Sequence, residues 1–341
     1  MIENNNRKRV LFRADGDSVI GLGHIYRCLA IAERVNVYFD CYFAIKNSSN
    51  KLIKIISKLC TPIILEQFKS YSYEAEKLAA DIITQYKIDI IVLDGYSFDT
   101  SYQKIIKKKS KSILISIDDD QPFHYVSDVV INHAGGVSKE QISKEDYTKL
   151  FLGYNYLLLR KEFIQAFNTV RKISGINSVL ICFGGADPHD ITGQILNCLK
   201  HEKYIRKIII VIGASYLKLK ELEKSIDGYN HVEIKSNIGV KEMVLTMSNV
   251  DLAIVPSSTI GLEAFASKMI LITGMTARNQ KNIYNGLIKE KNVVGIGDFN
   301  TLNCPNLLQN ITNIASKFNN YTFNSEDKLN DNIVSLFKSL L

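Results

Sequence analysis

The sequence of 341 residues has no apolar run that approaches the roughly 20 residues a helix needs to span a bilayer. Its N-terminal stretch, Met1–Arg9, is polar and basic and lacks the apolar core of a signal peptide. Apolar residues make up 46% of the chain and charged residues 23%, which is typical of a soluble globular protein. We therefore expect a cytoplasmic protein without a membrane partner, long enough for two domains.

Closely spaced cysteines are also absent. The six cysteines form no Cys-x-x-Cys pair and are scattered along the chain: Cys28, Cys41, Cys60, Cys182, Cys198 and Cys304. Scattered cysteines of this kind are typical of buried free thiols in a reducing compartment. The sequence thus predicts neither a cysteine metal site nor a disulfide framework.

A dense basic and aromatic stretch, which would indicate nucleic-acid binding, is missing although the net charge is +7. The tightest basic cluster, Lys107–Lys109, falls at the predicted C-terminal end of a helix, where cations interact favourably with the helix dipole. We predict no nucleic-acid partner. A mild positive excess suits an anionic small-molecule substrate.

The most informative stretch that is present covers residues 12–30, FRADGDSVIGLGHIYRCLA. An apolar strand runs into a loop with three glycines, and an amphipathic helix follows from about Ile25 to Val35. Tyr26 stands where a dinucleotide fingerprint has its third glycine, and no P-loop lysine is present. His24 begins the helix, where the dipole disfavours an imidazolium, so it is a candidate general base. The alternative is an ordinary helix start with an incidental histidine.

The first half of the chain alternates strands and helices, which indicates a parallel sheet. Asp94, Gly95 and Tyr96 follow one predicted strand, and Asp118–Asp120 follow the next. Because parallel strands share one carboxyl edge, we expect both groups on the same edge as His24. The triple aspartate resembles a metal-binding Asp-x-Asp, but we interpret it as a loop and helix cap. The strands are predicted at 35–45, 88–93, 112–117 and 128–132, and the helices at 73–86 and 100–109.

A second alternating set begins near Asn177. Gly184 and Gly185 follow a predicted strand over 179–183, and glycines let a backbone approach a ligand closely. Ser257, Ser258 and Thr259 follow a strand over 251–255 and begin a helix, whose N–H groups attract phosphate. His133 and His189 are expected in exposed loops, where histidines usually have no specific role.

These patterns predict an α/β fold with two doubly wound, Rossmann-like domains that face each other across a cleft. The first, residues 1–160, carries His24. The second, residues 161–341, carries the glycine loops and includes the C-terminal helices. A single large sheet is the competing geometry.

One stretch resembles a known family. Phe12–Gly16 (FRADG) with Ile20–Ala30 (IGLGHIYRCLA) resembles the N-terminal signature of the UDP-2,4-diacetamido-2,4,6-trideoxy-β-L-altropyranose hydrolases of pseudaminic acid biosynthesis. Supporting stretches are Asp94-Gly95-Tyr96, Ile117-Asp118-Asp119, Leu157–Phe163, Phe183–Asp187, Ser257-Ser258, Glu263-Ala264 and Asn279-Gln280. The resemblance covers about residues 8–290 and extends to the GT-B-like glycosyltransferases.

The resemblance implies an inverting hydrolysis that needs no metal and no cofactor. His24 would deprotonate the attacking water, Tyr96 and Asn279 would position sugar or water, and Asp15, or second Asp17, would orient His24. The substrate would be bound by Arg13, Gly21, Gly23, Gly184, Gly185, Ser258, Thr259, Glu263 and Gln280. Arg13 either holds an acetamido carbonyl or pairs with Asp15. The small-molecule UDP-sugar is the expected partner, and a monomer the expected state.

Two alternatives stay open. A glycosyltransferase of the same architecture would use His24 on an acceptor hydroxyl in place of water, and a non-catalytic module would bind the nucleotide sugar without turnover.

Overall fold

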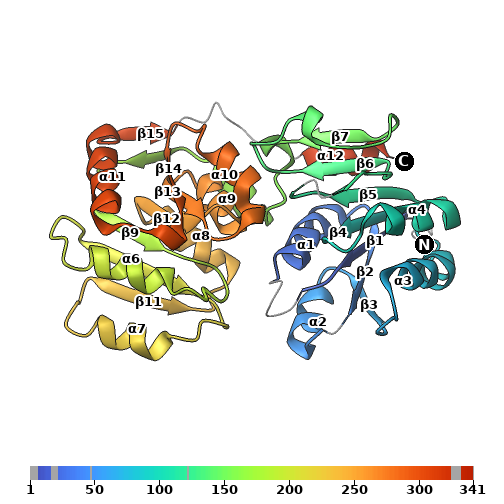
Figure 1. The fold of residues 1–341 in the computed structure, drawn as a ribbon, viewed down its shortest axis with the longest axis horizontal. Coiled ribbons are helices and arrows are strands. Elements are labelled where there is room, and N and C mark those ends of the chain that lie inside the picture. The colour runs from blue at the N-terminus through green and yellow to red at the C-terminus, as the bar shows by residue number, and fades with distance from the viewer. Residues whose placement is uncertain (1–6, 17–21, 47, 121–122, 324–331, 341) are drawn as a thin grey trace, which may run out of the picture. The chain divides into compact units, whose positions relative to one another are not determined.

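The structure is a computed structural model that describes residues 7–16, 22–46, 48–120, 123–323 and 332–340 (Figure 1). The chain divides into two compact α/β units. One comprises residues 1–161 with 330–341, and the other residues 162–329.

The first unit is built on a seven-stranded sheet in the order β3-β2-β1-β4-β5-β6-β7. All its strand pairs are parallel. Its strands are β1 (Arg9–Ala14), β2 (Asp40–Lys46), β3 (Thr61–Leu65), β4 (Ile90–Asp94), β5 (Ile113–Ile117), β6 (Val129–Asn132) and β7 (Lys149–Leu152).

Helices cover both faces of this sheet, which explains why its central strands are almost continuously apolar. On β1, Val10 and Phe12 face the core beneath α1 and α2, whereas Leu11 faces the core beneath α3 and α4. The helices of the unit are α1 (Gly23–Val35), α2 (Asn50–Ile56), α3 (Tyr71–Lys77), the π-helical η1 (Leu78–Ile83), α4 (Thr100–Lys109), the short 3-10 turns η2 (Lys139–Gln141) and η3 (Tyr154–Tyr156), and α12 (Asn332–Ser339).

The second unit repeats this plan with a six-stranded parallel sheet in the order β11-β10-β9-β12-β13-β14. A short antiparallel pair, β8 with β15, lies outside that sheet. The strands are β8 (Arg171–Ile173), β9 (Ser178–Ile181), β10 (Lys207–Ile212), β11 (Val232–Ser236), β12 (Leu252–Pro256), β13 (Ile270–Met275), β14 (Val293–Asp298) and β15 (Tyr321–Phe323). The helices are α5 (Lys161–Phe167), α6 (Ile191–Leu199), α7 (Leu219–Ser225), α8 (Val240–Ser248), α9 (Thr259–Ala266), η4 (Arg278–Gln280), α10 (Lys281–Leu287), η5 (Phe299–Thr301) and α11 (Cys304–Lys317).

Each sheet contains one point where the strand order reverses. In the first unit β1 pairs directly with β4, from Val10 beside Ile90 to Ala14 beside Asp94. In the second unit β9 pairs with β12 in the same way. Ligands of doubly wound folds bind at the carboxyl ends of the strands at this point. The predicted fold class, two Rossmann-like α/β domains, is confirmed.

The last helix corrects the predicted domain assignment. We expected the C-terminal helices in the second domain, but α12 belongs to the first unit. Ile333, Leu336 and Phe337 are buried in the same core as α1, and the ring of Phe337 meets that of Phe39 edge-on at 6.0 Å. An amphipathic helix shows which of its faces is buried but not which partner buries it.

Several other elements differ from the prediction. Helix α1 ends at Val35 as predicted, but β2 starts at Asp40 instead of residue 35. The edge strands β3, β7 and β14 were not predicted; they are short, and most of their residues are at least partly exposed. Cys198 and Cys304 form a disulfide between α6 and α11, so the prediction of six free thiols is wrong for this pair. The four other cysteines are free and buried.

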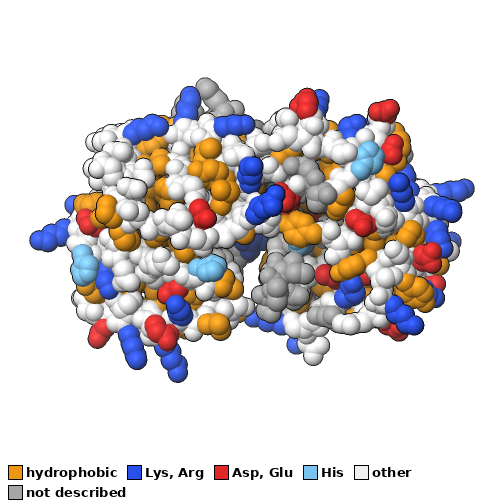
Figure 2. Space-filling view, viewed as in Figure 1, with side chains coloured by type: hydrophobic (Ala, Val, Ile, Leu, Met, Phe, Trp, Pro, Cys, Tyr) orange, Lys and Arg blue, Asp and Glu red, His pale blue; other side chains and the backbone are white. Residues whose placement is uncertain are grey.

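Figure 2 shows how the charged side chains are distributed over one face of the molecule. In Figure 2 the Lys and Arg side chains are scattered over the visible face, and those that are described form no continuous basic stripe. No helix in the described ranges combines the length and apolar character needed to cross a membrane.

Because α12 contributes to the first core, shortening Phe337 tests its assignment. Phe337→Ala should lower the free energy of unfolding by roughly 3–5 kcal/mol, since it removes a fully buried aromatic side chain. Urea unfolding followed by circular dichroism measures this loss. Ser335→Ala, at an exposed position of the same helix, serves as the control and should change stability little. A Phe337→Ala protein as stable as the control would contradict the assignment.

Candidate active site

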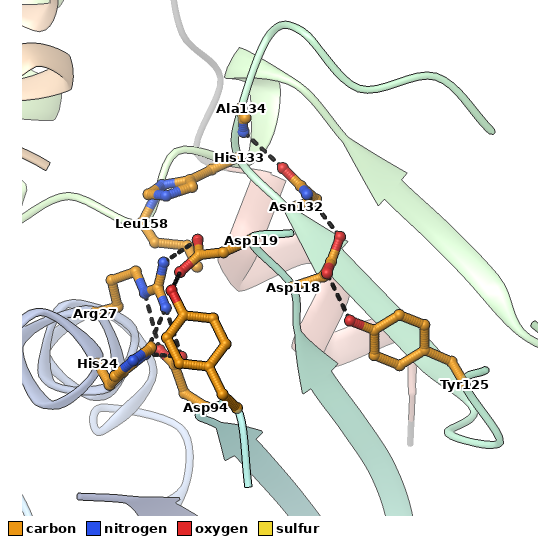
Figure 3. Close-up of polar contacts among 11 residues, drawn as sticks. His24, Arg27, Asp94, Asp118, Asp119, Tyr125, Asn132, His133, Ala134 and Leu158 are labelled. Atoms are coloured by element: carbon orange, nitrogen blue, oxygen red, sulfur yellow. Dashed lines mark hydrogen bonds and ion pairs between the residues drawn. The ribbon is translucent and has the colours of Figure 1, made fainter. Parts of the chain in front are cut away.

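Four polar side chains of the first unit gather at the carboxyl edge of its sheet, where the strand order reverses (Figure 3). His24 is the second residue of α1, and Asp94 is the last residue of β4. Arg27 lies one turn further along α1, and Asp119 follows β5. The sequence expectation that His24, Asp94 and the aspartates after β5 share one edge is therefore confirmed.

His24 is oriented by Asp94. The Nδ1 atom of the imidazole lies 2.7 Å from Oδ1 of the carboxylate, and Asp94 is completely buried. A carboxylate at neutral pH carries no proton, so the bond requires Nδ1–H of His24 to donate to it. This tautomer leaves the lone pair on Nε2, which is the arrangement of a general base held by a carboxylate. The ring itself is 7% exposed.

Arg27 holds the same carboxylate in a bidentate pair. Its Nε donates to Oδ2 of Asp94 at 2.9 Å, and its Nη2 donates to Oδ1 at 2.6 Å. Nη2 also lies 2.7 Å from Nδ1 of His24. Nδ1 cannot both donate to Asp94 and accept from Arg27, and we assign its proton to the bond with the charged carboxylate.

Asp119 accepts a hydrogen bond from Nη1 of Arg27 on the opposite side of the guanidinium. Burial by itself would raise the pKa of Asp119, but the charge of Arg27 and this bond hold the pKa below its ordinary value. The same guanidinium has its own pKa raised, because Asp119 and Asp94 outweigh the effect of burial. Asp119 and Arg27 are therefore both charged at neutral pH.

Tyr96 completes the cluster. Its ring meets that of His24 edge-on, with centroids 5.1 Å apart, and its hydroxyl donates to Oδ2 of Asp119 at 3.4 Å. The side chain is 43% exposed, so it borders the solvent-accessible side of the site. A small cavity begins at His24 and Tyr96 and continues to Phe123 and Tyr125.

Asp118, next to Asp119 in the sequence, forms hydrogen bonds with Tyr125 and Asn132. Its carboxylate accepts from the hydroxyl of Tyr125 at 2.5 Å and from the amide of Asn132 at 2.7 Å, and Figure 3 shows it turned toward them. The side-chain oxygen of Asn132 accepts from the backbone N–H of Ala134 at 2.8 Å. These bonds fix the chain after β5 to the chain after β6. Among the described residues, no group of three or more His, Cys, Asp and Glu is placed to hold a metal ion.

His133 corrects the expectation of an exposed loop histidine, because it is completely buried. Its Nδ1 accepts a hydrogen bond from the backbone N–H of Leu158 at 3.3 Å. Its Nε2 has no hydrogen-bond partner among the described residues. Burial, reinforced by the positive charge of Arg27, lowers the pKa of His133 to about 4.

Arg13 pairs with Asp15, which was one of its two expected roles, whereas the expectation that Asp15 orients His24 is wrong. Arg13 is completely buried and forms a bidentate pair with Asp15, with both N–O distances 2.6 Å, and a bond of 2.8 Å to Glu74. These partners, rather than a substrate carbonyl, engage its donors. Asp15 also accepts from the backbone N–H of Lys46, and the role of orienting His24 belongs to Asp94. Asp15 is close to His24 in the sequence, but its carboxylate is paired with Arg13, which lies on β1.

The predicted phosphate loops lie at the corresponding edge of the second sheet. Gly184 has a φ of +79° and follows β9, while Ser258 and Thr259 follow β12 and begin α9. The first N–H groups of α9 have no acceptor within the helix, as at every helix start. Glu263 lies buried inside α9.

Gly213 fixes the position of the loop after β9. A Cβ atom at this residue would lie 2.5 Å from the Cα atom of Gly185, closer than real Cβ contacts come. The carbonyl of Gly185 accepts from the N–H of Ser215 at 3.1 Å. The carboxylate of Asp187 accepts hydrogen bonds from the N–H groups of Ile191 and Thr192 at the start of α6.

Of the remaining predicted residues, Asn279, Gln280 and Gly23 are described by the structure, and Gly21 and Asp17 are not. Asn279 is exposed within η4. The side-chain oxygen of Gln280 accepts from the backbone N–H of Thr276 at 2.8 Å, and its side-chain nitrogen donates to the hydroxyl of Thr276 at 3.0 Å. Gly23 is the first residue of α1. Gly21 and Asp17 lie outside the described residues. The substrate contacts expected of Asn279, Gln280 and Gly23 stay predictions.

Sequence reasoning missed Arg27 and Asp119 as members of the site and Asp94 as the orienting carboxylate. A signal for Arg27 was present, since it stands three residues after His24 on a helix and such residues share a face. Asp94 and Asp119 were expected on the same edge, but their pairing depends on side-chain geometry that spacing does not give.

No family model matches the sequence. Known proteins similar in sequence include the UDP-2,4-diacetamido-2,4,6-trideoxy-β-L-altropyranose hydrolase of Campylobacter jejuni, which is 27% identical over 83% of this chain and 97% of its own length. An uncharacterised protein of Methanocaldococcus jannaschii is 23% identical over 83% of this chain. The spore coat polysaccharide biosynthesis protein SpsG of Bacillus subtilis is 21% identical over 54% of this chain. The family resemblance is confirmed. The chain spans 58% of the archaeal protein's length and 52% of that of SpsG.

Solved structures show the same fold. MurG of Acinetobacter baumannii superposes with a TM-score of 0.65 at 12% identity, covering 97% of this chain and 99% of its own. The UDP-GlcNAc 2-epimerase of Methanocaldococcus jannaschii superposes with a TM-score of 0.58 at 14% identity, with 97% and 99% covered. At these identities the similarity establishes the GT-B-like fold of the chain.

The buried neutral state of His133 predicts a pH effect. The unfolded chain binds a proton at this residue near pH 6.5, whereas the folded protein does so only near pH 4. Folding stability should therefore fall as the pH drops from 6.5 to 4, by about 3 kcal/mol from this residue. Urea unfolding at several pH values should show that the free energy of unfolding falls more steeply between pH 6.5 and 4 in the parent than in His133→Asn.

Substitution of His124 by Asn is the control, because the His124 side chain is 40% exposed rather than buried. If the free energy of unfolding depended on pH in the same way in the parent and in His133→Asn, the prediction would be wrong.

Proposed function

We propose that this protein hydrolyses UDP-2,4-diacetamido-2,4,6-trideoxy-β-L-altropyranose, or a closely related UDP-sugar, to UDP and the free sugar. The observation that carries the proposal is the pair of His24 and Asp94 at the strand-order reversal of the first sheet. The 27% identical hydrolase of Campylobacter jejuni, matched over 97% of its length, supports the substrate class.

In the proposed reaction Nε2 of His24 takes a proton from a water molecule as its oxygen attacks the anomeric carbon. The bond from that carbon to the β-phosphate oxygen breaks, its electron pair leaves with UDP, and the configuration inverts. Asp94 accepts from Nδ1–H and so stabilises the imidazolium that forms. Tyr96 lies against the same ring and would position the water or the sugar.

The second unit would bind the leaving group. Backbone N–H groups near Gly185 and at the start of α9 would stabilise the departing diphosphate, since helix N-termini attract anions. Ser258 would contact the phosphate, Glu263 would reach the ribose hydroxyls, and Asn279 would position the sugar. UDP is a good leaving group, so one base suffices without a separate general acid.

A glycosyltransferase is the second candidate function, because a glycosyltransferase of Rickettsia africae shares the fold, with a TM-score of 0.62. There His24 would deprotonate an acceptor hydroxyl. Release of UDP in the absence of any acceptor favours hydrolysis, whereas tight UDP binding without release favours transfer or a different sugar.

The decisive assay incubates the protein with the altropyranose substrate, without acceptor, and follows UDP release with and without EDTA. We expect release that EDTA does not change. His24→Ala should lower kcat by about 10²–10⁴-fold, and Asp94→Asn should also lower it strongly because the imidazole loses its charged partner.

Both variants should still bind UDP, because the loops that we propose to bind the nucleotide belong to the other unit. His201→Ala, at an exposed position of the second unit, is the control and should keep full activity. Full activity in His24→Ala would show that another group is the base.

The nucleotide side of the proposal predicts a second effect. Gly213→Ala should weaken UDP binding at least about 10-fold, because its Cβ would displace the backbone of Gly185. Isothermal titration calorimetry with UDP measures the change. Gly175→Ala is the control, since its Cβ would meet only the end of the Asn177 side chain, at 3.3 Å. Equal affinities of the two variants for UDP would argue against a role of the loop after β9 in UDP binding.

A further inference from the structure

Asp119 connects the two side chains that lie on either side of His24. Its carboxylate accepts from Nη1 of Arg27, which holds Asp94, and from the hydroxyl of Tyr96, whose ring meets the imidazole. Its side chain is 15% exposed, so the carboxylate sits at the border between the buried pair and the open side of the site. Nothing in the proposed chemistry above assigns it a role.

We propose that Asp119 is a positioning residue that supplies the counter-charge for proton uptake by His24 and holds the phenol of Tyr96 beside the imidazole. This inference rests on the proposed function, because it concerns the same base.

The charge balance of the site carries the argument. Arg27 contributes one positive charge, and Asp94 and Asp119 contribute one negative charge each, so the cluster carries one net negative charge while His24 is neutral. When His24 takes a proton, the cluster becomes neutral. Without Asp119 the same step would leave one net positive charge in a largely buried site, which is unfavourable.

The other titratable groups near the site do not replace Asp119. His133 stays uncharged at neutral pH, because burial lowers its pKa to about 4. Cys28 stays protonated, because burial raises the pKa of its thiol. Asp118 is bonded to Tyr125 and Asn132 and is turned toward them (Figure 3). Asp119 is thus the carboxylate that faces Arg27 from the side opposite Asp94.

The hydrogen bond to Tyr96 adds a geometric role. Tyr96 follows Gly95, which has a φ of +153°, and nearly half of the Tyr96 surface is exposed. An exposed phenol has rotamer freedom that a hydrogen bond restricts. By accepting from the hydroxyl, Asp119 keeps the ring edge-on to His24, where it can order the attacking water or the sugar.

The test uses Asp119→Asn in the full chain, with Asp120→Asn as the matched control, since Asp120 is exposed in the same loop. In the UDP-release assay Asp119→Asn should lower kcat about 10–100-fold with little change in KM. The midpoint of the acid limb of the pH profile should move about 0.5–1 pH unit lower, because loss of a negative charge disfavours the imidazolium. Asp119→Glu should restore part of the rate, and Asp120→Asn should match the parent.

A double substitution tests the contact with Tyr96. If Asp119 acts partly through the phenol, Tyr96→Phe should cost less in the Asp119→Asn background than in the parent. Strict additivity of the two effects would overturn that part of the proposal. Thermal unfolding of each variant identifies any loss that comes from unfolding.

A measurement independent of turnover separates this inference from the proposed function. The ring protons of His24 are followed by NMR as the pH is changed, and their signals are assigned by comparison with His24→Gln. The midpoint of this titration should move to lower pH in Asp119→Asn but not in Asp120→Asn. A shifted titration in a protein that releases no UDP would support the counter-charge and refute the hydrolase. An unchanged titration in a folded Asp119→Asn protein would overturn the counter-charge, whatever the activity.

Discussion

The buried carboxylate of Asp94 is the constraint on which the candidate site depends. A completely buried negative charge is tolerated only when it is paired and hydrogen-bonded, and here Arg27 and His24 provide the pairing. The need to satisfy Asp94 fixes the tautomer of His24, the rotamer of Arg27 and, through Arg27, the position of Asp119. The chemistry assigned to His24 is therefore a consequence of how one buried charge is compensated.

The sheet topology explains why these groups meet. The β1–β4 pairing places the start of α1 beside the end of β4, so a helix residue and a strand-end residue come into hydrogen-bond distance although 70 positions separate them. The second unit repeats the topology at β9 and β12 but presents glycines and helix N–H groups at the corresponding edge. The same topology thus carries charged side chains at this edge in one unit and backbone donors in the other, which is what the proposed proton transfer and phosphate binding would require.

Particular residues show where sequence reasoning reached its limit. His24 and the aspartates after β4 and β5 were placed on one edge correctly, because the direction of parallel strands follows from the alternating pattern. Asp15 was chosen as the partner of His24 because it is near in sequence, yet it pairs with Arg13 inside the first unit. His133 was expected to be exposed because its neighbours are polar, but β6 and the segment at Leu158 enclose it.

The alternation of strands and helices, the two Rossmann-like units, a helix that starts close to His24 and the family resemblance could all be predicted from the sequence, because they depend on local periodicity and on contiguous motifs. Only the tertiary structure decided that Asp94 orients His24, that Arg27 and Asp119 belong to the site, and that α12 packs on the first unit. Hydrogen bonds and buried charge pairs join side chains from separate strands and helices, and their selection depends on distances that exist only once the sheet has formed.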